Sequence, residues 1–211
     1  MAALPPVVPE TAAASPILWR LTVLLLLAML MLTAADIGTT LIVLKGDAIE
    51  LNTYARTADG GLHTEFLILI NICILGPLAL AFHVGLRHAG RVPHDVLAFW
   101  WRHLFNFLSA HPRTAVYKGR APLRLVAAAL MLVIFKALVV FSNVLGTLGI
   151  LNPATLIGWI FTDAGFDGLP LWRAVYVVMI VPCYIAAVWL ASLTLRAVQS
   201  DHAITGEGSS A

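Results

Sequence analysis

The sequence predicts an all-α, polytopic membrane protein: a four-helix transmembrane bundle with one or two interfacial amphipathic helices. Hydrophobic residues make up 60% of the 211 positions and charged residues only 11%, whereas about a quarter of the residues in a soluble domain are charged. Four apolar stretches are each long enough for a helix to cross a bilayer, which takes about 20 residues. The spans are predicted at about 17–44, 66–86, 123–151 and 174–195.

Charged residues inside these spans are few. The first span carries Asp36 well inside, the third carries Lys136 near its middle, and the second and fourth contain no Asp, Glu, Lys or Arg. Residues 1–16, which are rich in proline, and residues 199–211, which end in Gly and Ser, are predicted to be flexible tails around a membrane domain at 17–198.

The first span has one alternative interpretation. Its apolar run at 21–32, followed by Thr33-Ala34-Ala35, resembles a signal peptide that would be cleaved. The run continues to Leu44, which a cleaved segment does not need. A retained span is therefore expected, with cleavage as the alternative.

The connection between the second and third spans is basic, and the other two connections are acidic. Its only acid is Asp95, and its bases are Arg87, Arg91, Arg102, Arg113, Lys118, Arg120 and Arg124. Lys and Arg in short loops are retained on the cytoplasmic side. With four spans, a cytoplasmic middle loop places both termini in the cytoplasm.

That middle loop contains a predicted interfacial helix at about 95–108. Apolar residues recur at helical spacing on one side of it, namely Leu97, Trp100, Trp101, Leu104 and Leu108. Arg102 marks the opposite side. The two tryptophans suit the headgroup region and the basic residues suit anionic lipid, so an anchor is expected, with a docking surface for a partner as the alternative.

A second interfacial segment is predicted to begin at Asn152-Pro153. Leu156, Trp159 and Ile160 repeat there at i, i+3 and i+4. The expected role is again an anchor, and the alternative is a lid over the outer end of the bundle.

The intramembrane polar residues are the main candidates for function. Asp36, Thr39 and Thr40 share one face of the first helix, which should point into the bundle. Asp36 lies roughly 12 Å below Leu44, and Lys136 lies roughly 18 Å below Leu148. A lysine side chain covers most of that difference, so an ion pair between Asp36 and Lys136 is predicted.

Two amides, Asn71 on the second span and Asn143 on the third, are expected to complete the hydrogen bonds of this pair. The polar centre then has two interpretations: a lock that fixes helix register, or an ion, proton or substrate site. Small residues four apart, at Ala34/Gly38 and at Ser142/Gly146, are expected to let helices approach closely.

The sequence favours no cofactor and no metal site. Five histidines lie in or beside the middle loop, namely His83, His88, His94, His103 and His111. Their spacing matches no zinc-ligand pattern, and a haem held by two histidines would need an in-membrane His on another span. The two cysteines, Cys73 and Cys183, are expected to be packing residues. No nucleic-acid partner is expected.

The run Asp36-Ile-Gly-Thr39, then Gly46, then Glu50-Leu51-Asn52, resembles the signature of a family of small bacterial inner-membrane proteins of unknown function. That family has a Glu-x-Asn-Pro turn, and here Thr53 replaces the proline. The resemblance covers about the first quarter of the chain. It implies a bacterial inner membrane, and a group of residues acting together at the outer end of the first helix: Asp36, Thr39, Glu50 and Asn52.

Three functions remain open. The first is a non-catalytic subunit or scaffold that acts through lipid, other membrane proteins or self-association. The second is a small transporter or ion-conducting bundle that uses Asp36 and Lys136. The third is an intramembrane enzyme whose outer-face carboxylates are Asp36, Glu50 and Glu65. No nucleophile or phosphate-binding motif accompanies them, so no catalytic residue is assigned and an enzyme is not expected. Gly46, Glu50, Asn52 and Glu65 are together termed the outer-mouth motif.

Overall fold

The computed structural model describes residues 16–44, 57–58, 63–101, 104 and 115–207, and the regular structure in these ranges is helical. The long helices are α1 (Pro16–Leu44), α2 (Thr64–Arg87), α5 (Ala115–Thr147) and α7 (Gly168–Glu207). The short ones are the 3₁₀ turn η1 (Ala89–Arg91), α3 (His94–Ala98) and α6 (Pro153–Asp163). The long helices are apolar enough to cross a membrane, which confirms the predicted all-α bundle.

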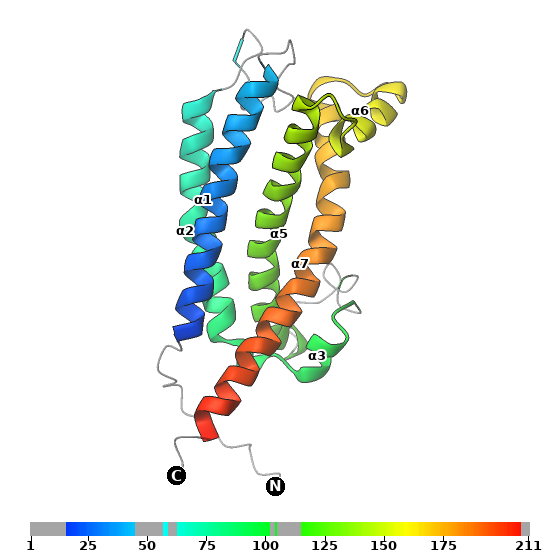
Figure 1. The fold of residues 1–211 in the computed structure, drawn as a ribbon. Coiled ribbons are helices and arrows are strands. Elements are labelled where there is room, and N and C mark those ends of the chain that lie inside the picture. Colours follow the sequence, from blue (N-terminus) through cyan, green and yellow to red (C-terminus); the bar gives the residue numbers. More distant parts are fainter. Residues whose placement is uncertain (1–15, 45–56, 59–62, 102–103, 105–114, 208–211) are drawn as a thin grey trace.

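The four long helices run side by side, with α6 at one end of the bundle and α3 at the other (Figure 1). Helix α5 packs against α1, α2 and α7, and α6 packs against α7. Helix α1 begins, and α7 ends, at the end that carries α3. We call this the α3 end and the opposite one the α6 end.

Apolar packing is concentrated at the α3 end. The connected cluster of buried apolar residues that forms this core includes Leu18 and Leu25 of α1, and the buried Met29 lies outside the cluster. On α5 it does not extend past Ala129. The other helices and the loop contribute Phe82, Leu86, Val92, Val96, Leu97, Val188, Ala191, Leu195 and Val198. The half of the bundle that contains Asp36 and Lys136 lies outside this cluster, although Val175 and Met179 of α7 are buried there.

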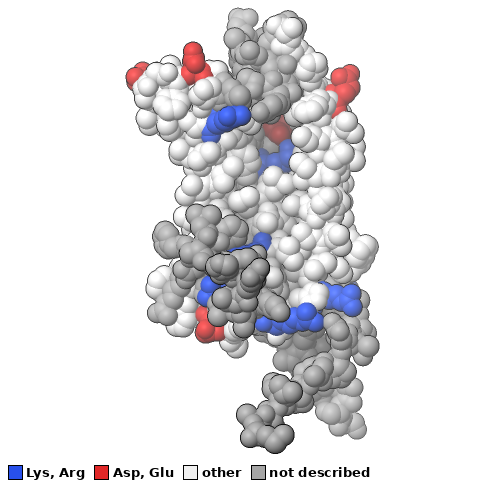
Figure 2. All heavy atoms as spheres, turned by 180° about the vertical axis from the view of Figure 1, so that it is seen from behind, with Lys and Arg blue, Asp and Glu red and all other residues white. Residues whose placement is uncertain are grey.

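Charged side chains gather towards the two ends of the bundle, and most atoms between them are uncharged (Figure 2). At the α3 end the elements carry Arg20, Arg87, Arg91 and Arg196. At the α6 end they carry Glu65, Asp163 and Asp167. The uneven distribution of charge along the sequence thus makes the α3 end richer in basic residues and the α6 end richer in acidic ones.

The third long helix ends earlier than predicted, at Thr147 instead of 151. Gly149 takes a φ of 68°, a left-handed conformation that glycine adopts without a steric penalty. The N–H of Ile150 then bonds to the carbonyl oxygen of Leu145 at 2.9 Å, and the N–H of Gly149 bonds to that of Gly146 at 3.1 Å. These two bonds form a Schellman motif, which terminates the helix.

Helix α6 forms where Asn152-Pro153 predicted a short helix. Asn152 caps it by accepting a hydrogen bond from the N–H of Thr155 at 2.9 Å, and Pro153 occupies the first turn, where its missing N–H costs nothing. A second Schellman motif ends α6 at Gly165, with a φ of 86°. The rings of Phe161 and Phe166 meet edge to face beside it, at 5.4 Å.

The C-terminal tail predicted at 199–211 is wrong over most of its length, because α7 continues to Glu207. Val198 is completely buried, and Gln199 bonds to the loop that follows α2. These tertiary contacts stabilise a helical continuation that local composition did not predict. Residues 1–15 and 208–211 lie outside the described residues.

The continuous interfacial helix predicted at 95–108 is also wrong. Helix α3 ends at Ala98, and Phe99 and Trp100 lie in a turn before Trp101, which is helical again. Leu97 is fully buried in the core, whereas Trp101 is 51% exposed. Because Leu97 is buried against α7, it cannot share one exposed apolar face with Trp101, and the helix breaks between them. Arg102 and Leu108 lie outside the described residues.

Close packing at the small-residue pairs is only partly as expected. A Cβ on Gly38 would meet no atom within 4 Å, so this residue makes no close helix contact in the described structure. A Cβ on Gly146 would meet the Asn152 amide at 3.3 Å. Among the glycines that the structure describes, the closest contact with a neighbouring helix is at Gly85 of α2, which the small-residue pattern did not single out.

Candidate functional site

An ion pair joins α1 and α5 inside the membrane-spanning part of the bundle. Nζ of Lys136 lies 3.0 Å from Oδ2 of Asp36, and the lysine donates a hydrogen bond to the carboxylate. The two side chains are 12% and 21% exposed, respectively. The contact predicted from helix depth is confirmed, although the partners are separated by 100 residues in the sequence.

The arithmetic of helix depth explains this contact. Asp36 lies six residues before Ile42, where the first span ends, or roughly 9 Å. Lys136 lies eleven residues before Thr147, the end of the third span, or roughly 17 Å. Both helices run from the α3 end towards the α6 end (Figure 1). The long lysine side chain spans the remaining difference, and a charge-assisted hydrogen bond neutralises both groups.

Asn143 is near the pair but does not bond to it, contrary to expectation. Its Nδ2 donates to Thr40 Oγ1 at 3.0 Å and to Thr39 Oγ1 at 3.4 Å. The hydroxyl of Thr39 lies 2.8 Å from the backbone carbonyl of Ala35, to which it can donate, so its lone pair remains available to Asn143. Asn143 is two turns beyond Lys136 on α5. Since the long lysine side chain reaches ahead to Asp36 and the shorter Asn143 does not, Asn143 meets α1 at Thr40, only one turn beyond Asp36.

Asn71 does not complete the ion pair either. Its Nδ2 donates to the carbonyl oxygen of Leu67, one turn earlier in α2, at 2.7 Å. Its Oδ1 accepts a hydrogen bond from Thr33 of α1 at 3.4 Å. The sequence placed Asn71 at the correct depth but could not give its direction around the α2 axis.

Together these contacts form a polar row along α1. Thr33 meets α2, Asp36 meets α5, and Thr40 meets α5 again. The three positions are spaced at i, i+3 and i+7, which places them along one side of a helix. The apolar core does not reach this region, so in the described residues the row provides the polar contacts between α1 and its neighbours there.

A second polar contact, which the sequence analysis missed, lies at the α6 end. Ser142 is 4% exposed, and its hydroxyl donates to Oδ1 of Asn152 at 2.9 Å. The same oxygen accepts the N–H of Thr155 that caps α6. One amide oxygen thus fixes the start of α6 onto the end of α5. The asparagine before a proline signals a helix start, but nothing in the sequence indicates that it also receives Ser142.

The α3 end carries another missed cluster. Nε2 of Gln199 donates to the carbonyl oxygens of Ala89 and Val92 at 2.9 and 3.0 Å. Nη2 of Arg196 donates to the carbonyl oxygen of Leu97. Two side chains of α7 thereby bind three backbone carbonyls of the loop that follows α2. Bonds to backbone carbonyls have no sequence signature, because any residue supplies the acceptor.

The outer-mouth motif is mostly outside the described residues, which exclude Gly46, Glu50 and Asn52. Its remaining member, Glu65, lies in the first turn of α2 and is exposed. An acid in the first turn interacts favourably with the helix dipole, which is a sufficient local reason for its position.

In the part of the chain that the structure describes, no group of three or more His, Cys, Asp or Glu side chains is placed to hold a metal ion. The hydroxyl of Thr22 lies 2.8 Å from the Leu18 carbonyl, to which it can donate, so its oxygen can accept from Nδ1 of His83 at 3.1 Å. Nδ1 of His88 lies 2.9 Å from the carbonyl oxygen of Val84, one turn earlier. His83 therefore joins α2 to α1, and His88 contacts only its own helix.

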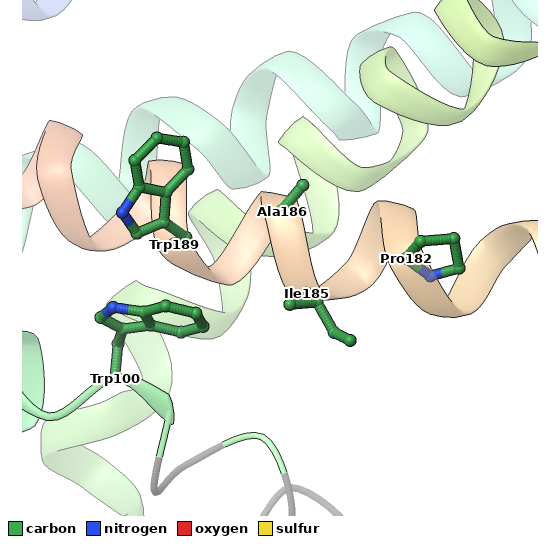
Figure 3. Close-up of a pocket in the computed structure, with 5 residues that line it drawn as sticks. All are labelled: Trp100, Pro182, Ile185, Ala186 and Trp189. Atoms are coloured by element: carbon green, nitrogen blue, oxygen red, sulfur yellow. The ribbon is translucent and has the colours of Figure 1, made fainter.

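An open apolar groove runs beside α7. It has a volume of about 310 Å³ and is lined by Trp100, Pro182, Ile185, Ala186 and Trp189. Trp100 comes from the turn after α3, and the other four come from α7 (Figure 3). The two indoles lie on either side of the groove at one end. The predicted interfacial tryptophan thus lines a groove and is not simply an exposed anchor.

Comparison of this chain with protein-family models, with curated proteins and with solved structures finds no match to any of them.

Proposed function

We propose that this chain is a multi-pass protein of the bacterial inner membrane that acts through contacts with lipid and with other membrane proteins, as a non-catalytic subunit or a self-associating scaffold. The observation that carries the proposal is the closed Lys136–Asp36 pair, at 3.0 Å. An ionised group inside a membrane needs a partner, and here each charge supplies the other's. Such a pair fixes which helices pack together and requires no ligand for its stability.

The neighbouring contacts support the same role. Thr33, Thr40 and Asn143 each bond to a side chain of another helix, so the polar row joins three helices. Interhelical polar contacts in membranes contribute about 0.6 to 2 kcal/mol each, which is enough to select one register among several. The polar row then holds the helices in register in one half of the bundle, as the connected apolar cluster does in the other half.

The exposed surface of α2 supports the contacts with partners. Within α2 no residue before Phe82 is fully buried. Its exposed large apolar side chains include Phe66, Ile68, Leu69, Ile70, Ile72, Ile74 and Leu80. Lipid or a helix of another protein would cover such a surface in a membrane. Two alternatives for the partner follow: a second copy of this chain, or a different membrane protein.

We infer the orientation from charge, with the α3 end and both termini in the cytoplasm. The α3 end carries Arg20, Arg87, Arg91 and Arg196 beside the acids Asp95 and Asp201, and the α6 end carries Glu65, Asp163 and Asp167. We also infer that α1 is retained and not removed as a signal peptide, because Leu18 and Leu25 belong to the core and Asp36 pairs with α5. The bacterial inner membrane rests on the resemblance at Asp36, Thr39, Glu50 and Asn52.

The second candidate is a small transporter or ion-conducting bundle. The specific observation in its favour is that Asp36 retains 21% exposure and Lys136 retains 12%, so the pair is not sealed from its surroundings. An ion or proton path would need such access. The enzymatic alternative gains no support from the pair, because the carboxylate that would act as a base is engaged by Lys136.

A charge-swap series distinguishes the two candidates. The variants are Asp36→Asn, Lys136→Met and the double exchange Asp36→Lys with Lys136→Asp, and the exposed Asp163→Asn at the end of α6 is the control. Each tagged protein is purified in mild detergent, its thermal unfolding midpoint is measured, and its co-purifying proteins are identified by mass spectrometry.

The proposed function expects each single variant to lose stability and a stoichiometric partner or oligomer, with partial recovery of both in the double exchange. Asp163→Asn should behave as wild type. Wild type that purifies as a monomer without partners would contradict the subunit proposal. A double exchange that is folded but loses a solute flux present in wild type would favour transport, because a carrier needs the chemistry of each group in its own place.

A further inference from the structure

A basic side chain, Arg196, lies two turns of α7 beyond the groove that Trp100 and α7 form. Pro182, Ala186, Trp189 and Arg196 lie at i, i+4, i+7 and i+14 of α7, which places them along one side of the helix. Arg196 contacts the carbonyl oxygen of Leu97 in α3, three residues before Trp100. The apolar groove and the guanidinium of Arg196 therefore lie in line along the same side of α7, beside the loop that contains α3.

The distance along α7 from Pro182 to Arg196 matches the thickness of one leaflet of a bilayer. Pro182 and Arg196 are fourteen residues apart, which is roughly 21 Å along the helix axis. Half of a bilayer, including its headgroup region, measures about 20 to 22 Å. Pro182 then lies near the bilayer centre and Arg196 at the level of the phosphates. Trp189 and Trp100 lie between them, close to the interfacial depth that tryptophan prefers.

Charge identifies the headgroup. The elements at this end carry Arg20, Arg87, Arg91 and Arg196. Acids are few there, and Asp95 in α3 is exposed. The guanidinium of Arg196 has five N–H donors, and the Leu97 carbonyl accepts a bond from one of its nitrogens, Nη2. The guanidinium therefore has donor capacity for a phosphate oxygen, and the surrounding positive charge favours an anionic headgroup.

We propose that the groove lined by Trp100, Pro182, Ile185, Ala186 and Trp189 binds one acyl chain of an anionic phospholipid, whose phosphate lies at Arg196. The lipid belongs to the leaflet at the α3 end. Ala186 is small, so it leaves space on the surface of α7 between Ile185 and Trp189. Trp100 comes from the loop and lies opposite the α7 side chains (Figure 3), so it would cover the bound acyl chain from that side. This inference requires a membrane-spanning chain but not the partner contacts proposed above.

Quenching of tryptophan fluorescence by lipids with brominated acyl chains tests the site directly. The full-length protein is reconstituted into phosphatidylcholine vesicles that contain increasing fractions of brominated phosphatidylglycerol or, separately, brominated phosphatidylcholine. A specific site predicts that one component of the quenching saturates with the anionic lipid. Half-saturation should occur at a mole fraction about fivefold below that for the zwitterionic lipid, which is the preference expected of one basic residue at the surface. Identical curves for the two lipids would overturn the proposal and leave only annular lipid.

Paired variants locate the component. The double variant Trp100→Phe with Trp189→Phe should remove it, because both indoles line the groove. Trp19→Phe should not, because Trp19 is 62% exposed on α1, near the same end of the bundle but outside the groove. Ala186→Phe should fill the groove and also remove the component while the helical circular dichroism is unchanged. Arg196→Gln should make the quenching curves of the two lipids coincide, and Arg196→Lys should keep the preference for phosphatidylglycerol. A saturating component that survives Ala186→Phe in a folded protein would contradict the proposal.

Discussion

Gly85 of α2 and Val126 of α5 are so close that a Cβ added to Gly85 would lie 2.7 Å from Cγ2 of Val126. The same Cβ would lie 3.0 Å from the backbone carbonyl oxygen of Pro122, which cannot move as a side chain can. Val126 is fully buried in the core. A single glycine therefore sets the distance between two membrane-spanning helices at the α3 end.

Gly85→Ala should destabilise the protein by about 1 to 3 kcal/mol, the usual cost of overpacking a core. The gain in helix propensity of up to about 1 kcal/mol offsets only part of this loss. The measurement is the midpoint of thermal unfolding in detergent. Gly76→Ala is the matched control on the same helix, because a Cβ there would meet nothing within 4 Å. A midpoint for Gly85→Ala at or above that of Gly76→Ala would contradict this account of the contact.

The sequence predicted those parts of the fold that depend on chemistry alone. The four spans follow from charge-free length, and the Lys136–Asp36 pair follows from helix depth, because two opposite charges in a membrane have few other partners. Direction around a helix axis was not predictable: Asn71 turned to Thr33, and Gly38 faces no neighbour. Such directions depend on how whole helices pack.

Contacts with the backbone were also beyond prediction. The extension of α7 to Glu207 depends on Gln199 reaching two carbonyls 107 and 110 residues away in the chain. The break after α3 depends on burial of Leu97. In both places the local pattern predicts a polar tail or an amphipathic helix, and a tertiary contact overrides it.

Asn152→Ala should loosen α6, because the amide oxygen of Asn152 both caps the helix and accepts the Ser142 hydroxyl. Loss of a cap together with a buried unsatisfied hydroxyl should cost about 1 to 3 kcal/mol. The expected readout is faster amide hydrogen exchange over Pro153–Asp163 and a lower unfolding midpoint.

Two variants separate the two bonds of Asn152. Asn152→Asp keeps an acceptor oxygen for both and should exchange like wild type, whereas Ser142→Ala removes only the second bond and should have the smaller effect. Exchange in α6 that is as slow in Asn152→Ala as in wild type would show that packing against α7 holds this helix without its cap.

Gln199→Ala should destabilise the loop at the α3 end. Ala89 and Val92 are almost completely buried, so their carbonyl oxygens would lose bonds that water cannot readily replace, at about 1 to 3 kcal/mol. Amides at 89–101 should exchange faster. Ser200→Ala is the control on the next residue, which is exposed and bonds only within its own helix, to Arg196. An equal effect of both variants would mean that the end of α7, and not the Gln199 bonds, holds the loop.

The two ends of the bundle should lie on opposite sides of the membrane, with the α3 end inside the cell. Single cysteines at Asp163→Cys and His94→Cys report on the two ends, in a background where Cys73 and Cys183 are replaced by Ser and Ala. Both native cysteines lie within spans, so this background leaves the loops unchanged.

In intact cells a membrane-impermeant maleimide should label Asp163→Cys only, and permeabilised cells should show labelling of both. Labelling of His94→Cys alone would reverse the orientation, because the basic end would then face outward against the usual retention of Lys and Arg. Labelling of both in intact cells would contradict the four-span topology itself, since α5 would no longer separate the two positions by a bilayer.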